Sequence, residues 1–463
     1  MSIQHSPRIS LEPYPVQPVT DDLLATAERT PRDIALVDGL TGETYTFARI
    51  VDASNAIARA LQDGGVEPGD RVGIVAPNSC QWVVAFMGTL LAGATVTTLN
   101  PLYTEREIRH QFSDSKPKAV FVADATADAT KLVWGDAPGL RLMSEVWALA
   151  GATKGAPEPV SFDPRTQLAV LPYSSGTTGE PKGVMLTHHN ITSNIRQTLG
   201  TGIIDGYSML INFLPFFHIY GMGVLMLPAL AVGATQVVLP GFDPKRFLEV
   251  TAEYRATNLF MVPPAMLMLA NASQEADLQS VRFILSGAAP LPIDIARRVE
   301  EAYDVQVVQG YGMTEASPVT HITLLGRDKP GTVGPPVADT RQRVVDLDSG
   351  ADVAVGDVGE LLVSGPQVMA GYFNRPDATA ESIVEDANGR WLRTGDIVTV
   401  DDEAYVTIHD RAKEMIKYRG YQIAPAELEA LIIEHPDCAD AAVIPVDTGT
   451  VDGEVPKAFV VRR

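Results

Sequence analysis

Hydrophobic positions along the chain form two alternating patterns. Short apolar runs rich in β-branched residues predict strands at 71–77, 94–100 and 117–123. Between them, the mostly apolar stretch 81–94 predicts a buried helix, and 104–115 has the pattern of a capped amphipathic helix. Strands that alternate with helices in this way are typical of βαβ units and a mostly parallel sheet.

The same alternation returns in the middle of the chain and then stops. The second series consists of strands at 234–240, 258–264, 281–290 and 305–312 and helices at 244–257 and 293–303. Strand-and-turn patterns then predict a β-rich subdomain over 340–411, and a charged strand, a turn and a capped helix begin a further unit over 412–463. The predicted fold class is α/β: a large N-terminal body over 1–411, made of βαβ-rich sheets plus the β-rich subdomain, and a small α+β domain.

Composition narrows the class of protein. The 463 residues exceed what one domain core usually holds, and 46% apolar with 20% charged residues is typical of soluble globular proteins. The net charge of −21 argues against a nucleic-acid partner and against adsorption to anionic lipid. The most apolar region, 210–240, is repeatedly interrupted by polar residues, glycine and proline, which favours buried core over membrane insertion.

Targeting and cysteine content favour the cytoplasm. The first residues contain no apolar signal core. Cys80 and Cys438 are the only cysteines and lie far apart in the sequence, so neither a disulfide framework nor a cysteine-based zinc site is expected. A reducing compartment fits this usage.

A glycine-rich stretch, "YSSGTTGEPKG" at 173–183, carries the strongest chemical signal. Glycines let backbone N–H groups approach phosphate oxygens, hydroxyl side chains can donate to them, and a lysine can neutralise their charge. The usual P-loop requires Ser or Thr after its lysine, whereas Lys182 is followed by Gly183. Taken alone, the stretch could also be a flexible surface turn.

The stretch resembles the phosphate-loop signature of the adenylate-forming superfamily, which contains acyl-CoA synthetases, luciferases and the adenylation domains of peptide synthetases. Further motifs follow in the family's order. They are "LPFFHIYGM" (214–222), "LSGAAPL" (285–291), "QGYGMTEASPV" (309–319), "GELLVSGPQVMAGYFNRPDAT" (359–379), "WLRTGDI" (391–397) and "DRAKEMIKYRGYQIAPAELE" (410–429). Their details are most similar to the 4-coumarate-CoA ligase branch.

The resemblance implies an acid–CoA ligase with ATP, Mg²⁺ and coenzyme A as its cofactor and co-substrates. A carboxylate would attack the α-phosphate of ATP, giving an acyl-adenylate and pyrophosphate. The CoA thiol would then displace AMP and form a thioester. Residues 1–411 would be the ATP- and acyl-binding domain, and 412–463 would be a mobile lid.

The resemblance also assigns residues to the nucleotide. Those implied around the phosphates are Ser174, Ser175, Gly176, Thr177, Thr178, Gly179 and Lys182, with Thr178 in direct contact. Gly287, Ala288 and Ala289 would form one wall of the adenine slot, with the ring of Tyr311 stacked on the other face of the base. The resemblance also implies nucleotide binding by Gln309, Gly310 and Gly312.

Four further positions complete the implied nucleotide site. Thr314 would contact the α-phosphate, and Glu315 would coordinate Mg²⁺, which prefers oxygen ligands. Asp396 would accept hydrogen bonds from the ribose hydroxyls, and Arg411 would support the ribose from the domain junction.

The acyl site is implied by the same motifs. His218 would line it and change rotamer to admit the thiol; a general base is not needed, because a carboxylic acid is already ionised at neutral pH. The remaining implied lining residues are Ile219, Tyr220, Val224, Leu285, Ala288, Gly310, Gly312, Pro318 and Val319. This mainly apolar slot would suit an aromatic or cinnamic acid, or a medium-chain fatty acid. Tyr220 could bind a ring hydroxyl or simply pack.

The lid motif implies further roles. Lys413 resembles the hinge about which the lid rotates between the half-reactions, and Gly420 resembles the glycine beside the pantetheine channel. Lys417 and Gln422 match positions that assist the chemistry, and Arg419 stands where the branch often has lysine.

One departure from the family concerns the end of the sequence. The family has an essential lysine in a Gly-Lys segment near its C-terminus, and this sequence stops before such a segment. We expect an incomplete lid, through shortening or mobility, rather than a naturally short protein. A polypeptide that truly ended at Arg463 should adenylate poorly while still binding the adenylate.

Other functions remain open at the level of sequence. An activating enzyme that loads a carrier-protein thiol, an inactive nucleotide- or adenylate-binding protein and a luciferase would share these motifs. A monomer or a homodimer is expected, with no nucleic acid and no stable membrane insertion.

Overall fold

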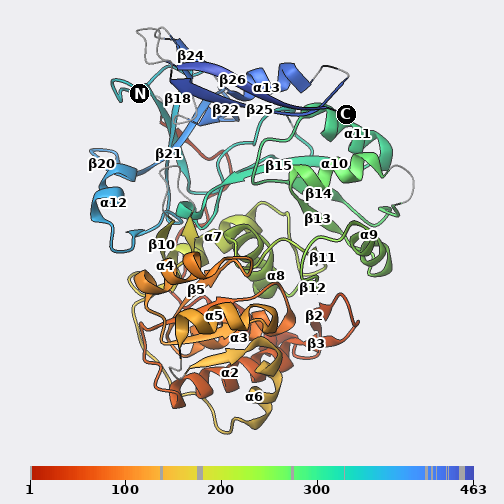
Figure 1. Cartoon of the computed structure of the whole chain (residues 1–463), viewed down its shortest axis with the longest axis vertical. Coiled ribbons are helices and arrows are strands. Elements are labelled where there is room, and N and C mark those ends of the chain that lie inside the picture. The colour runs from red at the N-terminus through yellow and green to blue at the C-terminus, as the bar shows by residue number, and fades with distance from the viewer. Residues whose placement is uncertain are drawn as a thin grey trace.

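A computed structural model describes residues 3–135, 139–174, 181–272, 276–327, 329–411, 416–418, 421–423, 425–433, 435, 437–447 and 454–462. Three large sheets form the body, and a small C-terminal unit lies at one end of it (Figure 1). The predicted α/β class is confirmed. The predicted boundary between 411 and 412 stays a prediction, because residues 412–415 lie outside the described set.

The first sheet has the order β19-β10-β8-β5-β4-β6-β7, with β9 paired to β10. Its strands are β4 (Arg71–Val75), β5 (Thr95–Leu99), β6 (Ala119–Val122), β7 (Leu140–Leu142), β8 (Leu168–Val170), β9 (Tyr173–Ser174), β10 (Lys182–Thr187) and β19 (Gly371–Tyr372). Strands β4 to β8 are parallel, whereas β10 runs antiparallel to β8, β9 and β19. The strand β19 comes from far along the chain, so this edge joins two distant motifs.

The helices around the first sheet are α1 (Thr20–Arg29), α2 (Phe47–Asp63), α3 (Cys80–Leu91), α4 (Glu105–Ser115), α5 (Ala127–Trp134), α6 (Val146–Ala152) and α7 (His188–Gly200), with the single turns η1 (Asp124–Thr126) and η2 (Met143–Glu145). The predicted strands and helices of the first series are confirmed. The predicted cap is present on α4, where Thr104 and Glu107 form a capping box.

The second sheet has the order β16-β15-β14-β13-β11-β12-β2-β3. Its strands are β2 (Ile34–Asp38), β3 (Thr44–Thr46), β11 (Met209–Asn212), β12 (Thr235–Val238), β13 (Asn258–Met261), β14 (Phe283–Ser286), β15 (Gln306–Gly312) and β16 (Val319–Ile322). Its helices are α8 (Leu227–Val232), α9 (Pro244–Glu253), α10 (Pro263–Asn271) and α11 (Ile293–Tyr303). The second βα series is thus confirmed, with α10 in addition.

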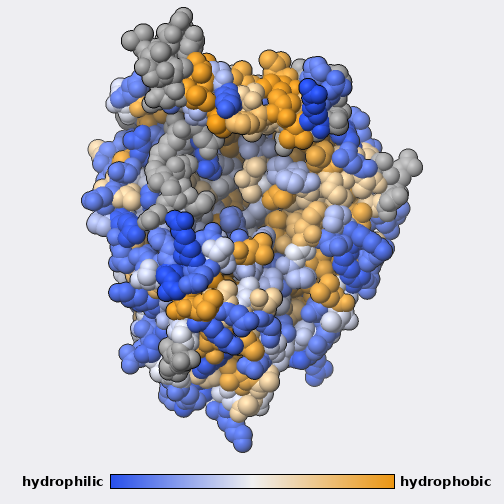
Figure 2. Space-filling view, viewed as in Figure 1, coloured by the Kyte–Doolittle hydropathy of each residue, from blue (hydrophilic) through white to orange (hydrophobic). Residues whose placement is uncertain are grey.

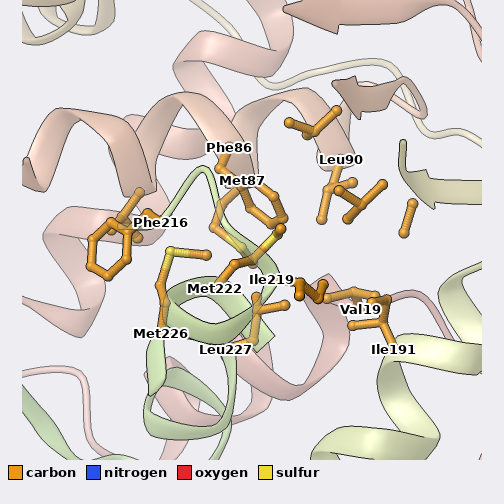
Figure 3. Packing of buried hydrophobic residues seen from close by; sticks show 14 of the residues in the cluster. Val19, Phe86, Met87, Leu90, Ile191, Phe216, Ile219, Met222, Met226 and Leu227 are labelled. Carbon is orange, nitrogen blue, oxygen red and sulfur yellow. The ribbon is translucent and has the colours of Figure 1, made fainter. Parts of the chain in front are cut away.

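A π-helix, η3 (Tyr220–Met226), follows directly after His218. Its apolar side faces α3: Figure 3 shows Met222 and Met226 among side chains that include Phe86 and Met87. A Cβ on Gly223 would lie 2.8 Å from Pro318 Cδ, so glycine allows η3 to approach the turn before β16. Wide helical turns of this kind are rare and frequent at functional sites.

The third sheet is antiparallel, as predicted for the β-rich subdomain. Its strands are β1 (Gln4–His5), β17 (Arg341–Val345), β18 (Gly359–Ser364), β20 (Ile383–Asp386), β21 (Gly389–Val400) and β22 (Val406–Arg411), and α12 (Pro376–Ser382) lies beside it. The N-terminal strand β1 pairs with β17, an addition that the sequence patterns did not indicate.

The C-terminal unit contains two hairpins and one helix. They are β23 (Ile416–Tyr418) with β24 (Tyr421–Ile423), β25 (Cys438–Asp447) with β26 (Glu454–Arg462), and α13 (Pro425–Ile433). Figure 2 shows apolar side chains gathered at this end. Among them Phe459, Val460 and Val461 are each more than half exposed.

Helix α7 connects the motif segments through a buried polar face. Asn190, Asn194 and Gln197 are spaced so that they share one side of the helix, and each is at least nine-tenths buried. Asn190 donates to the carbonyls of Pro366 and Val368 at 2.8 and 3.0 Å.

The side-chain amides of Asn194 and Gln197 form hydrogen bonds with further segments. The side chain of Asn194 donates to the carbonyl of Val319 at 2.8 Å and accepts from its N–H at 3.0 Å. Gln197 donates to the carbonyl of Ala338 at 2.7 Å and to the side-chain oxygen of Gln367 at 3.1 Å. Buried backbone groups need such partners, so one helix fixes the start of β16, the segment before β17 and the segment after β18.

Replacing Asn194 with alanine should destabilise the fold by about 3 kcal/mol, because it leaves the buried N–H and C=O of Val319 unpaired. Chemical denaturation measures this free energy. The control is Asn55→Ala on α2, where a half-buried asparagine with no such clamp should cost less than about 0.5 kcal/mol. Equal losses for the two variants would contradict the clamping role.

Candidate active site

The ends of the glycine-rich loop are held together by strand pairing. Ser174 of β9 pairs with Lys182 of β10, and Tyr173 pairs with Gly183. The hydroxyl of Ser174 is buried without a hydrogen-bond partner among the described residues, which suits a donor that awaits a ligand. The predicted loop residues Ser175, Gly176, Thr177, Thr178 and Gly179 lie outside the described residues.

Asp114 of α4 links the strand that precedes the glycine-rich loop to the 371–375 segment. It accepts a hydrogen bond from the hydroxyl of Tyr173 at 2.7 Å and from the side chain of Asn374 at 3.1 Å. The guanidinium of Arg375 lies 3.8 Å from the same carboxylate. Three groups therefore share one acidic side chain, which binds the 371–375 segment to the loop stem.

Lys182, Tyr372 and Glu315 meet at the same edge of the first sheet. The ammonium of Lys182 lies 5.2 Å from the centre of the Tyr372 ring, and the Tyr372 hydroxyl donates to Glu315 Oε1 at 2.8 Å. Burial, together with the Glu315 carboxylate, raises the pKa of Tyr372, so the phenol stays protonated and donates. Lys182 and Glu315, two predicted phosphate-site residues, are thus brought together.

The turn that carries Thr314 and Glu315 is η4 (Thr314–Ala316). The N–H of Met369 donates to the backbone carbonyl of Glu315 at 2.8 Å. The side chain of Glu315 is only 6% exposed, and its backbone and carboxylate are both held by the 369–372 segment. A buried carboxylate requires compensation by donors or a cation, and a metal ion is one such cation.

Tyr311 and Asp396 meet across the second and third sheets. The Tyr311 hydroxyl donates to Asp396 Oδ2, and the guanidinium of Arg411 lies 3.5 Å from Asp396 Oδ1. Asp396 and Arg411 also face each other in the β21–β22 register. The predicted ribose residues therefore come together, next to the predicted adenine-stacking tyrosine.

The other predicted nucleotide residues lie in the turn after β14 and in the last part of β15. Gly287 follows β14, and its N–H donates to the carbonyl of Met261 at 3.2 Å. Ala288 has a φ of 72°, a left-handed conformation that is uncommon for alanine. Gln309 accepts from the N–H of Leu291 at 3.3 Å, so its amide supports the turn from Gly287 to Leu291. Ala289, Gly310 and Gly312 lie in the same two segments.

Tyr220 begins the π-helix η3, and His218 lies two residues before it. The N–H of Tyr220 donates to His218 Nδ1 at 3.2 Å. The imidazole is solvent accessible yet has protein on most sides, and this burial lowers its pKa from 6.5, so it is neutral at pH 7. The Tyr220 hydroxyl donates to the carbonyl of Met261 at 3.3 Å, which leaves the phenol packed inside the protein rather than presented to a ligand.

The predicted acyl-lining residues fall into two parts of the core. Tyr220, Val224, Leu285 and Val319 are buried in one cluster. Ile219 is 3% exposed and belongs to the other cluster, where Figure 3 shows it among Met87 and Met222. Their role in substrate binding stays a prediction.

Most of the predicted lid residues cannot be placed. Lys413, Arg419 and Gly420 lie outside the described residues. Lys417 and Gln422 face each other in the register of the β23–β24 hairpin. Their assigned roles therefore remain predictions.

One cavity lies away from the predicted site residues, and a second lies at their margin. One of about 340 Å³ is lined by residues around the start of α9, including Leu239 and Arg246. One of about 60 Å³ lies beside α11 and includes Gln309. Within the described ranges no cluster of three metal-ligating side chains occurs, and no helix there is both long and apolar enough to cross a membrane.

Sequence reasoning missed three kinds of residue. Tyr372 stands within the quoted 359–379 motif, so the motif was a signal without an assigned role. Asp114 and the amide face of α7 carry no motif, and their partners are distant in sequence. Only the tertiary structure reveals them.

Comparison with known proteins decides the family. The sequence profile of the AMP-binding enzymes matches residues 23–373, and that of their C-terminal domain matches 427–463. The chain belongs to the AMP-binding enzyme family. Among its relatives are acid–CoA ligases, as the motifs predicted.

Two relatives are named 4-coumarate–CoA ligases. The chain is 36% identical to probable 4-coumarate–CoA ligase 1 of Dictyostelium discoideum, over 96% of this chain and 86% of the relative. It is 37% identical to 4-coumarate–CoA ligase 5 of Oryza sativa, over 94% and 83%.

Among solved structures, ATP-bound MatB from Rhodopseudomonas palustris superposes with a TM-score of 0.88 at 28% identity, covering 96% of this chain and 89% of that one. The o-succinylbenzoate CoA synthetase of Bacillus subtilis, in complex with its acyl-adenylate intermediate, gives 0.86 at 28% identity, over 97% and 89%.

A buried histidine, His321, lies next to Tyr311, the predicted adenine-stacking residue. The His321 ring is 5.7 Å from that of Tyr311, and its nitrogens contact Gln342 Oε1 at 2.7 Å and Thr320 Oγ1 at 2.9 Å. Burial lowers the pKa of His321 to about 4. The unfolded chain, with a histidine pKa of about 6.5, therefore binds a proton that the folded protein resists.

Lowering the pH from about 6 to about 5 should reduce the free energy of unfolding, because His321 takes up a proton in the unfolded state but not in the folded protein. One such proton gives a slope of about 1.4 kcal/mol per pH unit. In His321→Gln the decrease in the free energy of unfolding over this pH range should be smaller by about that amount. Above pH 7 the plots of unfolding free energy against pH should run parallel for the variant and the wild type. Urea unfolding at each pH measures this. Identical slopes would contradict a neutral buried His321.

Proposed function

We propose that the protein joins an aromatic or cinnamic-type carboxylic acid to coenzyme A in two steps at one site. A carboxylate oxygen attacks the α-phosphorus of ATP and pyrophosphate leaves, which gives the acyl-adenylate. The CoA sulfur then attacks the acyl carbon, AMP leaves, and the thiol proton is released. The meeting of Lys182, Tyr372 and Glu315 at the stem of the glycine-rich loop is the observation that carries this proposal.

The nucleotide's polyphosphate fits this edge of the sheet. Lys182 supplies positive charge, and the orphan hydroxyl of Ser174 supplies a donor on the paired strand. The remaining predicted loop residues would add donors from Ser175 through Gly179. Thr314, on the turn that carries Glu315, faces the α-phosphate in this arrangement.

The adenosine end fits the neighbouring sheets. Asp396 accepts from the ribose hydroxyls, and Arg411, 3.5 Å away, orients this carboxylate. Tyr311, near the end of β15, stacks on the adenine, with the turn 287–289 on the other side of the base. Because Tyr311 already donates to Asp396, its ring is held in place before the nucleotide arrives.

Glu315 fits a magnesium ion. The carboxylate is buried, and Tyr372 is its one hydrogen-bond donor among the described side chains. Mg²⁺ takes oxygen ligands and would shield phosphoryl charge when bound with ATP.

The acid would bind beside His218 and η3. A neutral His218 fits a gate that turns aside for the thiol, since the incoming carboxylate needs no base. The apolar cluster around Val224, Leu285 and Val319 suits an aromatic acid. The curated relatives named 4-coumarate–CoA ligases support that class, although a structural relative from Archaeoglobus fulgidus is a long-chain-fatty-acid–CoA ligase.

The second step would use the lid. We assign Lys413 as hinge, Gly420 to the CoA channel, and Lys417 and Gln422 to assistance in the chemistry. A carrier-protein thiol is the alternative acceptor, and a medium-chain fatty acid is the alternative substrate. Cytoplasmic location and a monomeric or dimeric state remain predictions.

A substrate panel tests the proposal. The full polypeptide with ATP, Mg²⁺ and CoA should release AMP and form a thioester, detected by mass, with cinnamic and coumaric acids in preference to benzoic, anthranilic and medium-chain fatty acids. Glu315→Gln should lower kcat/KM for ATP by about a hundredfold or more, because it weakens the stabilisation of phosphoryl charge. The control Asp22→Asn, at another buried carboxylate, should leave kcat/KM for ATP near the wild-type value.

Three other outcomes have distinct meanings. A preference for fatty acids would show that the proposed substrate class is wrong, while the proposed reaction would still stand. AMP without thioester would favour a carrier-protein acceptor. No AMP with any acid would refute the ligase proposal for this polypeptide.

A further inference from the structure

Tyr372 stands between two groups of opposite charge. Its ring faces the ammonium of Lys182 at 5.2 Å, and its hydroxyl donates to Glu315 at 2.8 Å. Lys182 and Glu315 are both described, and no ion pair joins them. One aromatic side chain thus contacts both charges and keeps them apart.

The backbone around Tyr372 is fixed on two sides. Tyr372 pairs with Val184 in the β10–β19 register, and its N–H donates to the hydroxyl of Thr379 at 2.8 Å. A Cβ on Gly371 would lie 2.8 Å from Thr379 Cγ2, so glycine is required for this close approach. The tyrosine is 9% exposed and therefore has little freedom to turn away.

We propose that Tyr372 is a positioning residue that acts as a spacer between Lys182 and Glu315. This inference rests on the proposed function, in which Lys182 faces phosphate and Glu315 faces Mg²⁺. The spacer prevents the lysine and the glutamate from neutralising each other, so that each charge remains directed at its own part of Mg·ATP.

The hydroxyl and the ring of Tyr372 have different effects on their partners. The hydroxyl fixes one carboxylate oxygen of Glu315 in place, as a donor behind a metal ligand does. The negative face of the ring attracts an ammonium within about 6 Å and holds Lys182 without removing its charge. Removing the hydroxyl and removing the whole ring should therefore have separable effects.

The alternative is that Tyr372 only fills space in the hydrophobic core. Tyr372 does belong to the main core cluster, and any large side chain would fill that volume. Packing alone, however, predicts a loss of stability and no selective change in the requirement for Mg²⁺. The measurements below separate the two roles.

Calorimetric binding of a non-hydrolysable ATP analogue, with and without Mg²⁺, tests the hydroxyl. Tyr372→Phe keeps the ring, so affinity without Mg²⁺ should stay within about twofold of wild type. The Mg²⁺ concentration for half-maximal enhancement of binding should rise about tenfold. In a Glu315→Gln background, the same change should shift the Mg²⁺ requirement less than about twofold, because the partner is already altered.

Tyr372→Leu tests the spacer. Without the ring, Lys182 and Glu315 can pair directly, so affinity for the analogue should fall about tenfold even without Mg²⁺. Lys182→Met supplies an independent comparison: it should weaken metal-free binding and leave the Mg²⁺ requirement unchanged. It also keeps the proposal testable if a Tyr372 variant fails to fold, which melting curves would report.

Tyr405→Phe is the matched control. Tyr405 is also buried, also carries a lysine over its ring, with Lys329 Nζ at 4.4 Å, and donates its hydroxyl to the carbonyl of Arg327 at 2.8 Å. The variant should lose a similar hydrogen bond without any change in the Mg²⁺ requirement.

Two results would overturn the inference. A wild-type Mg²⁺ requirement in Tyr372→Phe, or an equal shift in Tyr405→Phe, would reduce Tyr372 to packing while the proposed function stands. Failure of the wild-type protein to bind the analogue at all would refute the proposed function and this inference with it.

Discussion

Buried backbone groups that need hydrogen-bond partners constrain this molecule most strongly. The turns that carry its motifs lie inside the protein, where their N–H and C=O groups cannot reach water. Helix α7 satisfies several of them with Asn190, Asn194 and Gln197, on turns that come from three distant segments. The strand β10 joins the stem of the glycine-rich loop to α7, so the helix that fixes these segments is linked to the loop by one strand.

Charge within the site is arranged locally. The protein has a net charge of −21, yet the predicted ligand is a polyanion. In the proposed arrangement, Lys182 and Arg411 supply positive charge near the nucleotide. Lys182 lies beside the ring of Tyr372, and Arg411 lies 3.5 Å from a carboxylate that also accepts a hydrogen bond from Tyr311. Local placement of cations matters more for such a site than the overall charge.

Much of the fold could be predicted from the sequence, because period and propensity act locally. The strands β4, β5 and β6, the helix α3 and the capping box of α4 follow from patterns within a few residues. The packing of the π-helix η3 could not be predicted, since Gly223 approaches Pro318, which lies far along the chain. The same holds for β19, whose two residues pair with β10, a strand that lies far earlier in the sequence.

The site divides in the same way. Motif order indicated Lys182, Glu315, Asp396 and Arg411, and the structure brings these together in two pairs. It did not indicate Asp114, Tyr372 or the amide face of α7, because such supporting residues are defined by what they contact. Tyr220 shows the limit of residue type as evidence: the same phenol could face a substrate or the core, and its hydrogen bond to Met261 places it in the core.

A crystal structure of the protein with a non-hydrolysable ATP analogue and Mg²⁺ tests the central claim most directly. The account predicts phosphates between the loop stem at Ser174 and Lys182 and the turn at Glu315, ribose on Asp396, adenine against Tyr311, and an unchanged backbone in the turns held by α7. A nucleotide bound elsewhere, for instance in the cavity beside α9, or a direct Lys182–Glu315 ion pair in the complex, would contradict it.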